Sequence, residues 1–105
     1  MEGVRIPLPM DAIAACCQKW MISELALFGS VLRDDFRPDS DVDVLVSFAP
    51  EAHWTLLDFV DMQDEMAAIL GREVDLVSRR GIEHSLNIPR RTHVLQSARI
   101  VYAAA

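Results

Sequence analysis

The sequence is poor in long apolar runs and in basic residues. Nowhere do its 105 residues approach the roughly 18 consecutive apolar residues that a membrane helix needs, and the first residues lack the apolar core of a signal peptide. We therefore expect a cytoplasmic protein with no membrane segment. Sixteen acidic residues outnumber ten lysines and arginines, and the net charge of −6 argues against direct binding to nucleic acid.

Cysteine is scarce as well. Cys16 and Cys17 are adjacent in a helical pattern, where a disulfide between them is geometrically unfavourable. Buried thiols in a reducing compartment are the simplest interpretation. The three histidines are scattered without the spacing of zinc ligands, so we expect no zinc site.

Length and composition favour a single domain over residues 1–105, with 51% hydrophobic and 25% charged residues. Apolar periodicity predicts helices over residues 10–20, 55–70 and 87–102, and short strands over 25–28, 41–48 and 73–78. A helical turn is expected at 31–33, followed by a polar loop over 34–40. The predicted fold class is α/β (α+β), with a small mixed sheet of about three strands covered by helices.

The middle helix carries clear end signals. Thr55 and Asp58 fit a capping box at its start, and Gly71 fits a C-cap. Helical spacing predicts a polar stripe and a buried side. The polar stripe would contain Asp58, Asp61 and Glu65, and the buried side Leu56, Val60, Ala67 and Leu70.

A phosphate-binding turn is suggested where the first strand ends. Gly29 and Ser30 follow the apolar strand just before a helical turn, a junction that presents free backbone N–H groups to an anion. Most such junctions are plain turns. The pattern gains weight from Asp41 and Asp43, eleven and thirteen residues after Ser30, because two carboxylates on one face of a strand can share bound cations.

Asp75 supplies a third carboxylate. It lies within the apolar strand at 73–78, where aspartate is disfavoured by β-propensity and by desolvation. Three carboxylates near a phosphate-binding turn are what a two-metal nucleotidyl transfer site requires. Two arginine pairs, Arg79-Arg80 and Arg90-Arg91, would either be solvated on the surface or bind a phosphate tail or a partner.

The segment from Phe28 to Val46 resembles the signature of the MNT family, the minimal nucleotidyltransferases of the polymerase-β-like superfamily. The shared pattern is Gly-Ser, an arginine three residues later, Ser-Asp-x-Asp at the start of a strand, and a later strand aspartate. The resemblance implies that Gly29 and Ser30 contact the nucleotide phosphates and that Asp41 and Asp43 bind Mg²⁺, with two ions and ATP as substrate. Asp75 would be the third carboxylate, orienting or deprotonating the acceptor hydroxyl.

Two further residues match the signature with less definite roles. Arg33 would contact phosphate or brace the acidic loop, and Ser40 would cap or orient the loop before Asp41.

The family also implies a partner. MNT proteins resemble antitoxins paired with a HEPN-domain toxin, onto whose tyrosine they transfer AMP. Since the chain offers little beyond the expected catalytic core, we expect the acceptor to be another polypeptide. A non-catalytic antitoxin that binds its toxin stoichiometrically, and a small-molecule nucleotidyltransferase with a separate acceptor-binding subunit, are the alternatives.

Overall fold

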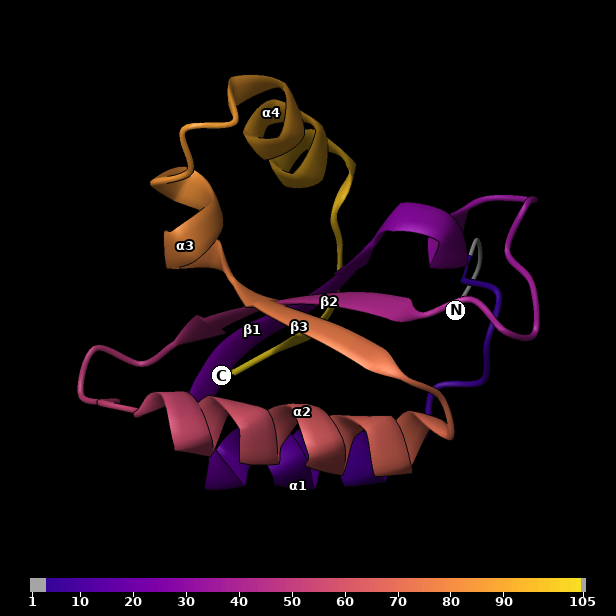
Figure 1. Ribbon diagram of the computed structural model, residues 1–105. Coiled ribbons are helices and arrows are strands. Elements are labelled where there is room, and N and C mark those ends of the chain that lie inside the picture. Colours follow the sequence, from indigo (N-terminus) through magenta and orange to yellow (C-terminus); the bar gives the residue numbers. More distant parts are fainter. Residues whose placement is uncertain (1–3, 105) are drawn as a thin grey trace.

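A sheet of four strands forms the centre of the computed structural model, which describes residues 4–104 (Figure 1). The strands are β1 (Ile22–Phe28), β2 (Val42–Phe48), β3 (Val74–Ser78) and β4 (Arg99–Ala103), and their order in the sheet is β3-β2-β1-β4. β1 runs antiparallel to β2 and β4, whereas β2 and β3 are parallel. The sheet is therefore mixed, as the sequence predicts.

The helices lie in two layers, one on each face of the sheet (Figure 1). One face is covered by α1 (Met10–Lys19) and α2 (Leu56–Leu70), the other by α3 (Arg79–Glu83) and α4 (Ile88–Ser97). A short 3-10 helix, η1 (Gly29–Leu32), follows β1 directly. Across residues 4–104, no helix combines the length and apolarity needed to cross a membrane.

The alternation along β2 separates two cores. Val42, Val44 and Val46 are completely buried in the core that includes α1 and α2. Leu45, which points the other way, packs in a smaller cluster with Ile82 of α3 and Val94 of α4. The predicted period of two is confirmed, and it directs the odd-numbered residues of β2 toward the α3 and α4 side.

The ends of α2 match the prediction, but its buried side does not. Thr55 and Asp58 form the capping box, and Gly71 ends the helix in the left-handed conformation. The helix rests on the sheet through Met62 and Met66, which are four residues apart and almost inaccessible. Leu56 and Val60 are exposed instead.

The predicted helix over 87–102 is wrong beyond Ser97. Ala98 is extended, and the chain continues into β4, which pairs with β1. The outer edge of β1 needs hydrogen-bond partners, and Ile100 and Val101 are β-branched residues that suit a strand. This pairing makes the sheet four-stranded rather than three-stranded. The helix α3 was not expected either; Ser78 caps it by accepting a hydrogen bond from the Gly81 N–H at 3.0 Å.

The expectation of two buried thiols is confirmed. Cys16 and Cys17 are buried and free. Trp20 and Trp54 meet edge to face, with ring centroids 5.2 Å apart. The indole N–H of Trp20 donates to Glu65 at 2.8 Å, which ties α1 to α2.

Candidate active site

The register between β2 and β3 places Asp43 directly opposite Asp75. Both residues lie on the face turned away from α1 and α2, because their neighbours Val42 and Val74 are buried in the core on that side. Neighbouring strands are about 4.8 Å apart, so these two carboxylates stand side by side. Asp41 lies one residue before β2, at the same end of the sheet. The fold thus brings the three predicted carboxylates to one end of the sheet, which we call the carboxylate edge.

The turn after β1 lies against the same carboxylates. Phe28, the last residue of β1, pairs with Asp43 across the sheet. Gly29 then adopts φ +77°, and a Cβ built at this position would overlap Oδ2 of Asp43. Two separate reasons therefore require glycine here, the left-handed backbone and the approach of the Asp43 carboxylate. Ser30 follows within η1, which the completely buried Val31 anchors to the core.

Negative charge is concentrated at this edge. Burial raises the pKa of the Asp43 carboxyl above its ordinary value, and the charges of Asp75 and Asp41 raise it further. Arg90 and Arg33 act in the opposite direction on the same pKa. An excess of like charge that is only partly compensated favours binding of a cation.

The donor chemistry at this edge fits Mg²⁺. Carboxylate oxygens are hard ligands of the kind that this ion takes, and their mutual repulsion would fall when it binds. Within the described part of the chain, however, no three aspartate, glutamate, histidine or cysteine side chains are already gathered as a ligand set. Asp41, Asp43 and Asp75 would hold the ion through their side-chain oxygens.

Two further predicted site residues have definite contacts in the loop before β2. Ser40 Oγ accepts a hydrogen bond from the Arg37 N–H at 3.0 Å, which closes the turn just before Asp41. Arg33 Nε donates to Asp35 at 3.1 Å, a contact that suits the brace interpretation. Because the charge of Arg33 also lowers the pKa of Asp43, its guanidinium acts on the carboxylate edge as well. Contact of Arg33 with phosphate stays a prediction.

Of the four arginines whose role the sequence left open, Arg90 is the one whose charge acts on the site. It lies in the first turn of α4, where Asn87 Oδ1 accepts its backbone N–H at 3.2 Å. Its charge acts on Asp43 although 47 positions separate the two residues in the sequence. Nothing in the local sequence distinguishes Arg90 from Arg91, which donates to the Glu83 and Ser85 carbonyls and so supports the α3–α4 loop.

Arg90 also lines a hollow of about 420 Å³ at the C-terminal end of β3. Apolar and polar side chains from α2, β3, α3 and the α3–α4 loop share its wall. The residues that line it are Phe59, Val77, Ser78, Gly81, Ile82, Ser85 and Arg90. The hollow begins two residues beyond Asp75 on the same strand face.

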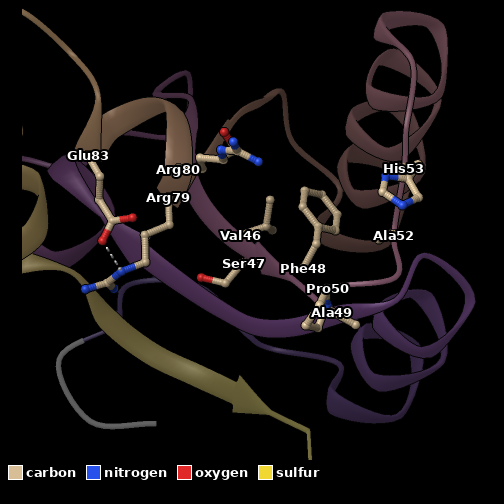
Figure 2. A pocket seen from close by; sticks show the side chains of 11 residues that line it. Val46, Ser47, Phe48, Ala49, Pro50, Ala52, His53, Arg79, Arg80 and Glu83 are labelled. Carbon is tan, nitrogen blue, oxygen red and sulfur yellow. Dashed lines mark ion pairs between the residues drawn. The ribbon is translucent and has the colours of Figure 1, made fainter.

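A second hollow, of about 330 Å³, lies at the C-terminal end of β2 (Figure 2). Arg79 Nε pairs there with Glu83 at 3.5 Å, and Arg80 and His53 also line the hollow. Val46 and Ser47, which line it, lie three and four residues after Asp43, about 10 and 13 Å along a strand. This hollow shares Ser78 with the hollow at the end of β3. Arg79 is paired within it, whereas binding of a phosphate tail or a partner by Arg80 stays a prediction.

The family model of the nucleotidyltransferase domain matches residues 10–102. The chain belongs to this family. This nucleotidyltransferase is 35% identical over 69 residues to the protein adenylyltransferase MntA of Thermococcus cleftensis, an alignment that covers 66% of the chain and 68% of the relative. It is also 29% identical over 66 residues to a candidate protein adenylyltransferase of Methanocaldococcus jannaschii, of whose length it spans 66%.

Solved structures agree with the observed fold. The nucleotidyltransferase is 36% identical to a protein described as a candidate minimal nucleotidyltransferase, with a TM-score of 0.64 and 85% of each chain covered. A toxin–antitoxin complex crystallised with AMP-PNP contains a chain with a TM-score of 0.70 and 19% identity, covering 92% of this chain and 75% of that one. The predicted family and fold class are thus confirmed, with four strands in place of about three.

Proposed function

We propose that this nucleotidyltransferase transfers AMP from ATP, with Mg²⁺, to a tyrosine hydroxyl of a partner HEPN-domain toxin and so acts as its antitoxin. The observation that carries the proposal is the pairing of Asp43 with Asp75 beside the Gly29 turn. The MntA relative is a protein adenylyltransferase, and the toxin–antitoxin neighbour was crystallised with an ATP analogue, which supports ATP as the substrate and a toxin as the partner.

Each side chain at the edge has a part in this reaction. Gly29 and Ser30 would contact the phosphates through backbone N–H groups of the turn after β1, beside the Asp43 carboxylate. Asp41 and Asp43 would hold Mg²⁺, with Asp75 as the third carboxylate. Two bound ions would neutralise the triphosphate and stabilise the attacking and leaving oxygens. Residues 1–105 would act as one catalytic domain.

The chemical step is a substitution at the α-phosphorus of ATP. The acceptor oxygen forms a bond to this phosphorus as the bond to the pyrophosphate oxygen breaks, and pyrophosphate leaves. The proton of the acceptor hydroxyl passes to Asp75, whose exposed carboxylate can accept it and pass it to water. Arg33 and Arg90 would balance the negative charge that gathers at Asp43.

The proposal is tested by intact mass spectrometry of the protein encoded beside this gene. The co-expressed pair is incubated with ATP and Mg²⁺, and the double variant Asp41→Asn/Asp43→Asn serves as control. We expect the partner to gain one or more AMP units with the parent chain and none with the variant. Tandem spectra should place the AMP on a tyrosine.

Three other outcomes would each change the assignment. Equal transfer by the double variant would show that the carboxylates are not the catalytic ones. No transfer, together with a complex that silences the partner, would favour an antitoxin that acts by binding alone. Transfer from ATP to a small molecule but not to the partner would identify a small-molecule nucleotidyltransferase.

A further inference from the structure

We propose that the hollow at the C-terminal end of β3 is the acceptor pocket, which receives the aromatic hydroxyl side chain of the protein to be modified. This inference rests on the proposed function and names the place where its second substrate binds. The pocket measures about 420 Å³ and opens between α2, the end of β3 and the α3–α4 loop.

The pocket lies on the side from which the acceptor must approach the α-phosphorus. The attacking and leaving oxygens of a phosphoryl group lie roughly in line. The Gly29 turn, which would hold the leaving pyrophosphate, borders β2 on its β1 side. The pocket lies on the opposite side, at β3, beginning at Val77 just beyond Asp75. The acceptor oxygen therefore has to arrive from the side where the pocket is.

The lining of the pocket suits a phenol. Phe59, Val77 and Ile82 offer apolar surface for an aromatic ring. Arg90 lines the pocket, its charge also acts on Asp43, and it carries the positive charge that a phenolic oxygen needs as it loses its proton. An aliphatic hydroxyl on a small side chain would leave most of this apolar surface uncovered.

Exposed apolar residues neighbour the lining residues along the chain, and we infer that they border the mouth. Leu86 follows the lining residue Ser85 and is 96% exposed, and Ile88, two residues before Arg90, is 50% exposed. Leu56, one helical turn before Phe59, is 81% exposed. Neighbouring exposed apolar side chains mark contact surfaces on soluble proteins. A nucleoside inside the pocket would leave these residues in water, whereas a protein segment that carries the acceptor tyrosine would cover them.

The test compares two isoleucines of equal exposure. Ile88→Asp places a charge at the mouth, in a helix first turn where aspartate is favourable for folding. Ile100→Asp places the same charge on β4, the opposite edge of the sheet, from a residue that is also 50% exposed. Leu86→Asp is a second mouth variant. AMP transfer to the purified product of the adjacent gene is measured with each chain, while the concentrations of ATP and acceptor are varied separately.

We expect Ile88→Asp and Leu86→Asp to raise KM for the acceptor at least tenfold and to leave KM for ATP within twofold of the parent. Ile100→Asp should change neither. A rise in KM for ATP instead would show that the pocket holds the nucleoside, and unchanged values for both substrates would remove the pocket from the reaction. If the parent chain transfers no AMP, the proposed function fails. Binding of the same partner then decides whether the mouth is a docking surface, since only the mouth variants should weaken the complex.

Discussion

Gly29 and Asp43 are in direct contact: a Cβ on Gly29 would overlap Oδ2 of Asp43 unless the carboxylate moved. The turn that would hold phosphate and the carboxylate that would hold metal are therefore parts of one packed unit. A change in the turn displaces the carboxylate, although the two residues belong to different elements.

Gly29→Ala tests this contact. The left-handed φ of +77° costs an alanine about 1–2 kcal/mol in the free energy of folding, and the overlap moves Asp43 as well. We expect lower stability in urea unfolding and at least a tenfold loss of AMP transfer. Gly71→Ala is the matched control, because Gly71 has φ +68° but no atom within 4 Å of its virtual Cβ. It should lose similar stability and keep its activity, and equal loss of activity in both variants would contradict the contact.

Asp43→Asn should stabilise the fold near neutral pH in the presence of a chelator. The pKa of Asp43 is raised in the folded state, so the folded chain holds this proton more tightly than the unfolded chain. The associated stability is fully present below the ordinary carboxylate pKa of about 3.9 and is lost as pH rises through the folded pKa. Asparagine carries no charge at any of these pH values, so the variant does not lose this stability as pH rises.

The measurement is the melting temperature of both chains between pH 7 and pH 4. We expect the variant to melt higher at pH 7 and the difference to shrink as pH falls. A variant that is less stable than the parent at pH 7 would show that Asp43 is held by favourable contacts rather than strained by its neighbours.

Arg90→Gln should raise the pKa of Asp43 further, because the Arg90 charge now lowers it. The shift can be followed by carboxyl NMR without Mg²⁺. With Mg²⁺ and ATP, we expect AMP transfer to fall at least tenfold, which corresponds to about 1.4 kcal/mol. Arg79→Gln is the control, since Arg79 pairs with Glu83 in the hollow of Figure 2 and is not among the charges that shift the Asp43 pKa. An unchanged Asp43 titration in Arg90→Gln would remove Arg90 from the site.

The two thiols should react slowly in the native protein. Burial raises the pKa of Cys16 to about 11 and that of Cys17 to about 12, so almost no thiolate is present at neutral pH. We expect a thiol-specific reagent to label neither residue at pH 7 until the chain is unfolded, when both react. Rapid labelling of the folded chain would show that α1 opens locally.

The local sequence was enough for the parts of the molecule that depend on short-range periodicity. The alternation of Val42, Val44 and Val46 with the aspartates follows from the pleat of a strand. The capping box at Thr55 and the C-cap at Gly71 follow from hydrogen bonds within one turn. The glycine, serine and aspartates of the site were found because their spacing in the sequence resembles a family signature.

Only the tertiary structure decided the relationships that depend on register and edges. Helical spacing placed Leu56 and Val60 on the buried side of α2, but the packing of Met62 and Met66 on the sheet turned both outward. The segment after Ser97 became β4 because the free edge of β1 offered unpaired backbone groups. The pairing of Asp43 with Asp75 and the approach of Arg90 are long-range contacts. They are set by strand register and helix packing, which no local pattern contains.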